Sequence, residues 1–423
     1  TLNSFRKVFS EIQREYNNIN KVVYFWPYEE NKYIYKYENI INIIKTIHLE
    51  KLQINDVILV GKYQKDIERC YLESWIGFER SLGKMTFKSR VRTVMFEQDE
   101  LINDDLHLDN LILEINENKN HKSSLYCNRK RHELQIESQQ IQFHEDAIKR
   151  NGTYLITGGM GQLGYLFATY LAQKYSANLI LVGRGVLDTE KEQKVKVLKK
   201  MGARVLYYQA DVCNKQQMQQ VVDQGRSKFG SLDGVIYMAG ITNEISILKK
   251  STEEFNKTIE PKTKGIQILN DVLGDSIVDF VCYFSSLAAI LGDFGMCDYS
   301  VGNRFMMAYA SCMRQLYNNG SISRKTVVIG WPLWRDGGMK LKNGNDEEYL
   351  KMSGQRFLEA KEGLQCFEQI LSEPSKQYFI MTGNKKNILE KVNVENQESE
   401  VNYQTMDNRT NETKSIQTKE LNE

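Results

Sequence analysis

The sequence predicts an α/β protein in which a Rossmann-type, doubly wound parallel sheet follows a smaller, truncated Rossmann-like subdomain. From residue 152 onward, short runs rich in Val, Ile and Leu alternate with helical patterns, as in a parallel sheet that is covered on both faces. A glycine-rich turn follows the first of these runs, at the place where such a sheet receives a nucleotide. A less regular alternation of strands and helices occupies roughly the first 100 residues.

The first subdomain is assigned to residues 1–150. Apolar periodicity predicts strands at 21–25, 56–60 and 91–96, and helices at 1–20, 38–53 and 66–82. No glycine-rich turn follows these strands, so we expect a structural unit without a cofactor. Residues 97–135 are polar and are predicted to form a partly ordered connection, and residues 136–149 are expected to add a strand.

The second subdomain is assigned to residues 151–390. Its predicted strands lie at 153–157, 178–182, 204–208, 234–238, 279–285, 326–331 and 378–381, with helices between them. Residues 391–423 are rich in Asn, Gln, Glu, Thr and Lys, and they hold too few apolar side chains to offset the entropy of ordering. We therefore expect a disordered polar linker there.

Composition excludes several classes of protein. Hydrophobic residues make up 41% and charged residues 26% of the chain, as in ordinary globular proteins. The formal net charge is +2 and basic residues form no concentrated stripe, which argues against nucleic acid as a partner. No apolar run approaches the roughly 20 residues needed to cross a bilayer, so no membrane association is expected.

Cysteine and histidine usage points the same way. The seven cysteines are odd in number and form no CxxC pair, which predicts reduced thiols in a cytoplasmic protein, without a disulfide framework or a metal site. All five histidines precede residue 150, so chemistry carried by later residues cannot rest on histidine. The sequence opens Thr-Leu-Asn with no initiator methionine or signal peptide, and we expect a piece of a longer polypeptide.

The strand predicted at 153–157 runs into a G-x-G-x-x-G turn and then a helical pattern. Candidate cofactor contacts in this turn are Thr157, Gly158, Gly159, Gly161, Gln162, Leu163 and Gly164. Between a strand and a helix, such glycines permit a tight turn, the close approach of a pyrophosphate and close packing of helix on strand. The helix N-terminus supplies amides and the positive end of a dipole. The alternative is a glycine-rich turn that holds no ligand.

Residues at the ends of the next strands extend this motif. The second strand ends with Arg184, about 20 residues beyond the glycines, where a site for NAD usually carries an acidic residue. An arginine suits the 2′-phosphate of NADPH, which is therefore the predicted cofactor; the alternative is a solvated surface arginine. Asp211 and Val212 end the third strand, where Asp211 is a candidate partner of the adenine amine. Ala239 and Gly240 end the fourth, where small residues let a cofactor pass.

Polar residues around the fifth strand suggest catalysis. Ser286 closes the strand, Tyr299 lies thirteen residues later and Asn303 four residues after that. The four-residue spacing puts Tyr299 and Asn303 on one face of the helix predicted over 299–316. Lys262 lies 24 residues before Ser286.

These residue types suit hydride reduction of a ketone. The reaction needs a proton donor for the developing alkoxide and a second donor that polarises the carbonyl. A tyrosine hydroxyl beside a lysine ammonium serves as the acid, a serine hydroxyl as the second donor, and a cofactor supplies the hydride. Taken singly, each residue has a plain structural reading: a packed tyrosine, a capping serine, a solvated lysine. Because all four residues occur together, at suitable spacings after a dinucleotide motif, a catalytic role is favoured.

The pattern resembles the ketoreductase domains of modular polyketide synthases, within the short-chain dehydrogenase/reductase superfamily. Ordinary members of that superfamily carry Tyr-x-x-x-Lys, whereas here Asn303 takes the fourth place and the lysine lies upstream, an exchange typical of polyketide ketoreductases. The resemblance implies that the family's Lys, Ser, Tyr and Asn fall on Lys262, Ser286, Tyr299 and Asn303. Lys264 is a nearby rival, and the spacing from Ser286 favours Lys262.

The resemblance covers almost the whole chain. Residues 70–82 resemble the cofactor-free structural subdomain, and residues 331–339 resemble the segment beside the substrate, where an open cleft is expected. The family's activity is NADPH-dependent reduction of a β-ketoacyl thioester, carried on the phosphopantetheine arm of an acyl carrier protein, to the β-hydroxyacyl thioester. Neighbouring synthase domains are implied as further partners. The sequence is most similar to bacterial assembly lines whose acyltransferases act in trans.

Departures from the family pattern bear on stereochemistry and affinity. Residues 242–244 read Thr-Asn-Glu where members of one stereochemical class carry Leu-Asp-Asp, which implies the opposite, A-type class and an L-hydroxyl product. Leu291 stands where A-type members often carry Trp. Gln162 and Gly185 replace residues common in the family, and both are expected to weaken cofactor binding.

Three other functions stay open at this point. They are a free-standing short-chain dehydrogenase acting on a small ketone or alcohol, a non-reducing or epimerising ketoreductase-like module, and a non-catalytic interaction protein. The first needs only about 250 residues, which the 423-residue length argues against.

Overall fold

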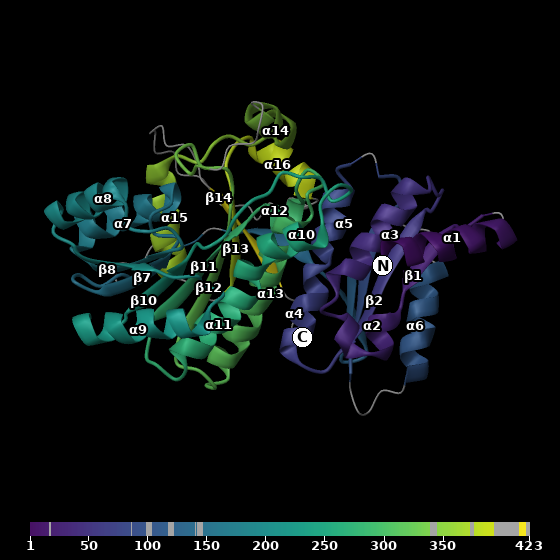
Figure 1. Cartoon of the computed structure of the whole chain (residues 1–423), viewed down its shortest axis with the longest axis horizontal. Coiled ribbons are helices and arrows are strands. Elements are labelled where there is room, and N and C mark those ends of the chain that lie inside the picture. Colours follow the sequence, from purple (N-terminus) through teal and green to yellow (C-terminus); the bar gives the residue numbers. More distant parts are fainter. Residues whose placement is uncertain are drawn as a thin grey trace, which may run out of the picture.

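The computed structural model contains two β-sheets, each in its own α/β unit (Figure 1). It describes residues 1–16, 18–85, 87–98, 104–116, 122–139, 141, 147–338, 345–372, 376–392 and 414–419. Among the described residues, no helix combines the length and apolar character needed to cross a membrane.

The first unit has a five-stranded sheet in the order β1-β2-β3-β4-β5. Its strands are β1 (Lys21–Tyr24), β2 (Asp56–Tyr63), β3 (Arg90–Glu97), β4 (Ser124–Cys127) and β5 (Lys130–Glu133). The first four strands are parallel and β5 returns antiparallel to β4. The helices are α1 (Leu2–Tyr16), α2 (Trp26–Glu29), η1 (Asn31–Tyr33), α3 (Tyr37–Leu49), α4 (Asp66–Ser74), α5 (Ile76–Leu82) and α6 (Asp104–Asn116). The three predicted strands are confirmed, and the single helix predicted over 66–82 is two helices.

Within the stretch 97–135, predicted as a partly ordered connection, the structure describes α6 and the β4–β5 hairpin, which the sequence did not predict. One of its charged side chains, Glu114, is buried and paired. Glu114 is 1% exposed, accepts hydrogen bonds from Ser124 and Tyr126 at 2.9 Å, and forms ion pairs with Arg92 and Arg131. A buried, fully paired carboxylate therefore organises a segment whose composition alone looks solvated.

The second unit has a nine-stranded sheet in the order β6-β14-β13-β12-β11-β10-β7-β8-β9. Its strands are β6 (Gln135–Gln139), β7 (Thr153–Thr157), β8 (Asn178–Gly183), β9 (Arg204–Gln209), β10 (Gly234–Tyr237), β11 (Phe280–Ser286), β12 (Lys325–Trp331), β13 (Gln377–Met381) and β14 (Lys414–Lys419). The strands from β9 to β13 in this order are all parallel, and the chain moves outward from β7 in both directions. The predicted doubly wound sheet is confirmed.

Two further strands extend the sheet: β6, which confirms the strand expected within residues 136–149, and β14, which was not predicted. β14 pairs antiparallel with both β13 and β6. The expectation of a structureless linker over 391–423 is therefore wrong for residues 414–419, whose backbone pairs with the edge of β13; composition does not register such edge pairing. β6 falls within residues 1–150, assigned to the first subdomain, yet it joins the second sheet.

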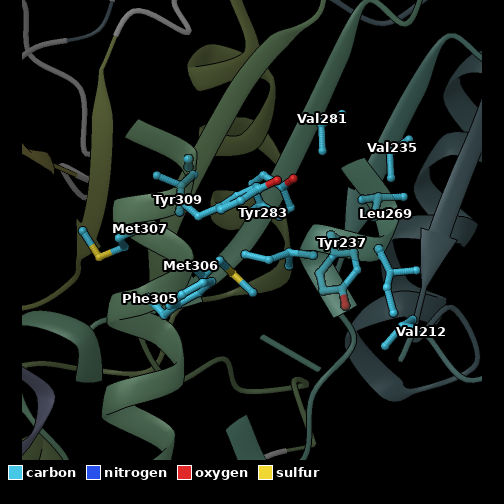
Figure 2. Close-up of a cluster of buried hydrophobic side chains, with 14 of the residues drawn as sticks. Val212, Val235, Tyr237, Leu269, Val281, Tyr283, Phe305, Met306, Met307 and Tyr309 are labelled. Carbon is cyan, nitrogen blue, oxygen red and sulfur yellow. The ribbon is translucent and has the colours of Figure 1, made fainter. Parts of the chain in front are cut away.

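Helices cover both faces of this sheet (Figure 1). Those on one face are α7 (Gln162–Tyr175), α8 (Thr189–Lys200) and α15 (Ala360–Ser372), and those on the other are α9 (Lys215–Phe229), α11 (Lys264–Leu273) and α13 (Asp298–Asn318). The remaining helices are α10 (Thr252–Ile259), η2 (Glu260–Lys262), α12 (Ala288–Leu291), α14 (Asn345–Ser353) and α16 (Lys385–Val392). Figure 2 shows side chains of β10, β11, α11 and α13 meeting in the second of these layers.

Helix α13 is also the main contact between the two units. Gly77 of α5 lies so close to α13 that a β-carbon there would be 2.5 Å from the backbone nitrogen of Val301. Arg304 forms an ion pair of 3.0 Å with Glu73 of α4. Helices α4 and α5 of the first unit therefore pack against α13, the helix that carries Tyr299.

Candidate active site

The glycine turn joins β7 to α7 at the carboxyl edge of the sheet. Gly158 has a φ of +71°, which favours glycine, and its amide donates to the Val182 carbonyl at 2.8 Å. A β-carbon on Gly164 would collide with the Gly158 carbonyl, so the first turn of α7 packs directly on the loop. Gly161 is the exposed N-cap of α7. The glycines of the turn thus place no side chain of their own over the N-terminus of α7, which suits the approach of a pyrophosphate.

The other predicted cofactor residues follow neighbouring strands along the same edge. Buried Thr157 accepts hydrogen bonds from the amides of Met238 and Ala239, both at 3.0 Å, and so fixes the segment before Gly240. Arg184 is exposed after β8.

The residues after β9 and in the first turn of α7 complete this edge. Asp211 accepts from the Cys213 amide at 2.8 Å, and Val212 is buried in the core. Gln162 is exposed and its side chain lies against Gly338, beyond β12, while Leu163 is partly buried.

Ser286, Tyr299 and Asn303 meet at this edge. Ser286 ends β11 and accepts a hydrogen bond from the Ala288 amide at 3.1 Å. Tyr299 lies in the first turn of α13, and its side chain hydrogen-bonds with those of Ser286 and Asn303. The Asn303 amide group also donates to the Tyr299 carbonyl at 2.8 Å, one helical turn away. Ser286 and Tyr299 are partly exposed, whereas Asn303 is buried behind them.

Lys262 reaches Tyr299 from η2. Its ammonium lies 5.5 Å from the centre of the Tyr299 ring. A β-carbon on Gly240 would lie 3.3 Å from that ammonium, and one on Gly302 would lie 3.2 Å from the lysine Cδ, so both glycines leave it room. The hydroxyl of buried Tyr237 donates to the Pro261 carbonyl at 2.6 Å, which fixes the backbone beside Lys262.

The rival lysine is placed elsewhere. Lys264 is exposed at the start of α11, whereas Lys262 is 4% exposed. Lys262 has no hydrogen-bond or ion-pair partner among the residues that the structure describes, and the buried Oδ1 of Asn303 has none among them either. These two groups leave unsatisfied polar capacity beside the Tyr299 side chain.

The electrostatics of the site follow from burial. Burial lowers the pKa of Lys262 from 10.5 to about 8. Burial raises the pKa of Tyr299, against the lowering effect of its hydrogen bonds to Ser286 and Asn303. The tyrosine is therefore protonated at neutral pH, beside an ammonium that is mostly charged there.

Comparison with known proteins identifies a family that contains the glycine turn and the residues around Tyr299. The KR domain family matches residues 152–336, which contain the glycine turn and Tyr299 with its three neighbours Lys262, Ser286 and Asn303. The chain belongs to the ketoreductase domains of polyketide synthases. A ketoreductase of this family is an oxidoreductase, and its Rossmann-type fold implies a nicotinamide cofactor.

The ketoreductase is 42% identical over 384 residues to the polyketide synthase PksM of Bacillus subtilis (strain 168), which covers 90% of this chain and 9% of that protein. It is 38% identical over 245 residues to the polyketide synthase ThaG of Burkholderia thailandensis, covering 57% of this chain and 4% of that protein. The chain thus spans less than a tenth of the length of either synthase.

Among solved structures, the chain is similar to a ketoreductase domain from the bacillaene assembly line, with a TM-score of 0.76, 27% identity and coverage of 86% of each chain. An N-terminal ketoreductase from the macrolactin assembly line gives a TM-score of 0.77 at 25% identity and covers 92% of this chain and 78% of that one. The similarity therefore extends over both units of the fold.

Residues 331–339 were expected beside the substrate at an open cleft, and the structure differs from this expectation at two of them. Trp331 and Trp334 are 4% and 5% exposed and pack against Phe167 in the core, so neither ring lines an open cleft. Both indole rings carry a large apolar area, so burying them in the core is more favourable than exposing them at an open cleft. Met339 lies outside the described residues.

A cavity of about 400 Å³ lies instead between the segment after β10 and helix α10. It is lined by Ile241, Thr242, Asn243, Glu244, Glu254, Lys257 and Thr258. Thr242 and Glu244, the residues that suggest the stereochemical class, therefore form part of its wall. Leu291, at the end of α12, is partly buried against the core.

Sequence reasoning missed a buried ion pair beside this site. Lys250 and Asp298 form it, and Asp298 directly precedes Tyr299. Burial raises the pKa of Asp298 to about 6, while Lys250 acts to lower it. The two residues are 48 positions apart and each resembles a solvated charge in the sequence, so no local pattern signals the pair.

Proposed function

We propose that this chain catalyses the NADPH-dependent reduction of a β-ketoacyl thioester, carried by an acyl carrier protein, to the β-hydroxyacyl thioester in polyketide biosynthesis. The observation that carries the proposal is the meeting of Tyr299 with Ser286, Asn303 and Lys262 at the sheet edge that holds the glycine turn. A proton donor, a carbonyl-polarising hydroxyl and a dinucleotide cradle thereby share one site.

The residues at the sheet edge suit NADPH. The glycine turn brings the N-terminus of α7 to the sheet edge and places no side chain of its own there, which fits a pyrophosphate. Exposed Arg184 follows β8, where a guanidinium suits a 2′-phosphate better than a ribose hydroxyl. Thr157 holds the segment that leads to Gly240 in one position through two hydrogen bonds. When bound, NADPH supplies the hydride.

Tyr299 then serves as the acid. Its raised pKa keeps the hydroxyl protonated at neutral pH, and Ser286 lies within hydrogen-bonding contact of that hydroxyl. Both groups donate to the ketone oxygen as negative charge develops on it. The proton of Tyr299 passes to the alkoxide, and the Lys262 ammonium, 5.5 Å from the ring centre, stabilises the phenolate that remains. Asn303 holds Tyr299 through its backbone carbonyl and its side chain.

The product is proposed to be the A-type, L-configured alcohol. Thr242 and Glu244 line the cavity beside α10, and they replace the first Leu and the last Asp of the Leu-Asp-Asp motif that marks the opposite class. Chiral analysis of the product thioester tests this assignment: an L-alcohol is expected, and a D-alcohol contradicts it.

The surrounding assembly is also part of the proposal. The aligned region covers only 9% of PksM and 4% of ThaG, which supports a ketoreductase that works beside other synthase domains. The proposed location of this assembly is the cytoplasm. An acyl carrier protein is the partner that presents the substrate, and a trans-acyltransferase bacterial assembly line is the proposed setting.

The test compares two substrates of the same acyl length under NADPH oxidation. A β-ketoacyl N-acetylcysteamine thioester mimics the carrier-bound substrate, and a simple ketone represents a free-standing dehydrogenase. The thioester is expected to be reduced with the higher kcat/KM. Preference for the simple ketone would reject the thioester assignment, and NADPH binding without turnover, even on carrier-bound substrate, would favour a non-reducing or epimerising module.

A further inference from the structure

The Lys250–Asp298 pair is fully buried and has no part in the chemistry described above. Both side chains are 0% exposed. Lys250 ends the segment 241–250 that follows β10, which we call the strap. Asp298 is the first residue of α13, and the next residue is Tyr299.

The pair connects the strap to the start of α13 through specific bonds. The Lys250 ammonium donates to a carboxylate oxygen of Asp298 and to the Asn243 carbonyl, the latter at 2.9 Å. The other carboxylate oxygen of Asp298 accepts from the Tyr299 amide at 2.8 Å. One ammonium thus links a cavity-lining residue of the strap to the backbone of Tyr299.

Further contacts fix the strap at its middle and its end. The Ile247 amide donates to the Gly295 carbonyl at 2.9 Å, and the Ile247 side chain is 0% exposed. From the first subdomain, Lys45 of α3 donates to the Lys250 carbonyl at 2.5 Å. The strap therefore has one defined position over α13, and residues 242–244 inherit it.

Stability alone does not account for a buried ion pair. Removing two charges from water carries a large desolvation cost, and well-packed apolar side chains of similar size often stabilise a fold as well or better. The pair instead contributes geometric specificity. The ammonium donates hydrogen bonds to the Asn243 carbonyl and to Asp298 at the same time, which fixes the distance between these two groups.

We propose that Lys250 is a positioning residue that sets the place of Thr242, Asn243 and Glu244 relative to Tyr299, and thereby controls substrate binding and product stereochemistry. The inference rests on the proposed function. The cofactor side of the site is held separately, since Thr157 fixes Met238 and Ala239 through its own hydrogen bonds. Loss of Lys250 should therefore affect the ketone substrate and leave the cofactor alone.

The test uses the double variant Lys250→Met/Asp298→Asn in the full chain. It removes both charges together, so no carboxylate is left buried and unpaired, and the substituted carboxamide side chain still offers a carbonyl oxygen to the Tyr299 amide. The single variant Lys250→Met is measured beside it. Lys215→Met, which removes an exposed lysine from a surface ion pair with Asp271, is the matched control.

For the double variant we expect KM for the thioester to rise about tenfold or more, because displacement of a substrate wall by about 1 Å has effects of that order. The enantiomer ratio of the product should fall, while the dissociation constant for NADPH stays within about twofold. A folded double variant with wild-type KM and enantiomer ratio would overturn the proposal. So would an equal loss of NADPH binding, which indicates a general structural role.

Hydrogen exchange gives a readout that does not depend on activity. In the double variant, amides of the strap and of residues 296–300 should exchange faster, while residues 157–165 keep wild-type rates. Unchanged exchange in the strap would reject the positioning role. If the wild type itself forms no alcohol, the proposed function fails, and the exchange result still decides whether Lys250 fixes the strap.

Discussion

Replacing Lys262 by methionine should stabilise the protein while impairing catalysis. Burial lowers the pKa of Lys262 from 10.5 to about 8. Each pKa unit corresponds to about 1.4 kcal/mol, so keeping the ammonium charged in the folded state costs about 3 kcal/mol. Methionine has a similar length and no charge, and we expect the free energy of unfolding at pH 7 to rise by up to that amount. For 423 residues, this corresponds to a rise in Tm of about 3–4 °C.

The gain should depend on pH in a defined direction. Between pH 8 and 10.5 the unfolded wild type binds more protons at this lysine than the folded one, so its stability increases with pH in that window. The advantage of Lys262→Met should therefore shrink from about 3 kcal/mol at pH 7 to about 1.4 kcal/mol at pH 9.5. The kcat should fall at least about tenfold, since the phenolate of Tyr299 loses its cation.

Denaturant-induced unfolding of the cofactor-free protein at pH 7 and pH 9.5 measures both values, and NADPH oxidation measures the catalytic loss. Lys264→Met is the matched control, because Lys264 lies two positions away with its side chain exposed, and the substitution should keep the wild-type free energy of unfolding. A Lys262→Met protein that is less stable than wild type at pH 7, or whose advantage does not change with pH, would show that the buried ammonium does not destabilise the fold.

Two further predictions test the cofactor assignment and the support of α13. Arg184→Ala should raise KM for NADPH about 10- to 100-fold and KM for NADH by less than about threefold, because only NADPH carries the 2′-phosphate; equal effects in steady-state kinetics would reject Arg184 as the phosphate partner. In Gly77→Ala the new methyl group would lie 2.5 Å from the Val301 nitrogen of α13, so the free energy of unfolding should fall by about 1–3 kcal/mol. Because α13 carries Tyr299, kcat should fall as well. Gly83→Ala is the milder comparison, because its β-carbon would lie 3.3 Å from the Glu79 carbonyl oxygen, and it should lose less stability than Gly77→Ala and keep activity. Thermal unfolding and NADPH oxidation compare the two variants.

The catalytic sheet could be predicted from the sequence almost strand by strand. Its strands are buried on both faces and read as continuous apolar runs, and the glycine turn marks where the first strand meets α7. The helix predicted over 299–316 is α13, Asp298–Asn318, which puts Tyr299 and Asn303 one turn apart. Local spacing was sufficient there because the residues lie on one element.

Structure that depends on distant pairing could not be predicted. The α6–hairpin segment folds around Glu114, whose arginine partners lie 17 and 22 residues away and look solvated in sequence. β14 pairs with the backbones of β13 and β6, which are distant from it in sequence. Lys250 and Asp298 come together because the strap crosses the start of α13, which no periodicity reveals.

The most direct test of the account is the reduction of a β-ketoacyl thioester by wild type and Tyr299→Phe. Tyr309→Phe is the matched control: Tyr309 lies on the same helix, ten residues later, with its ring in the core (Figure 2). If Tyr299 is the acid, kcat falls by about 10²- to 10⁴-fold in Tyr299→Phe while NADPH binding persists, and Tyr309→Phe keeps most of its activity. A Tyr299→Phe enzyme with near wild-type kcat would show that Tyr299 is not the proton donor.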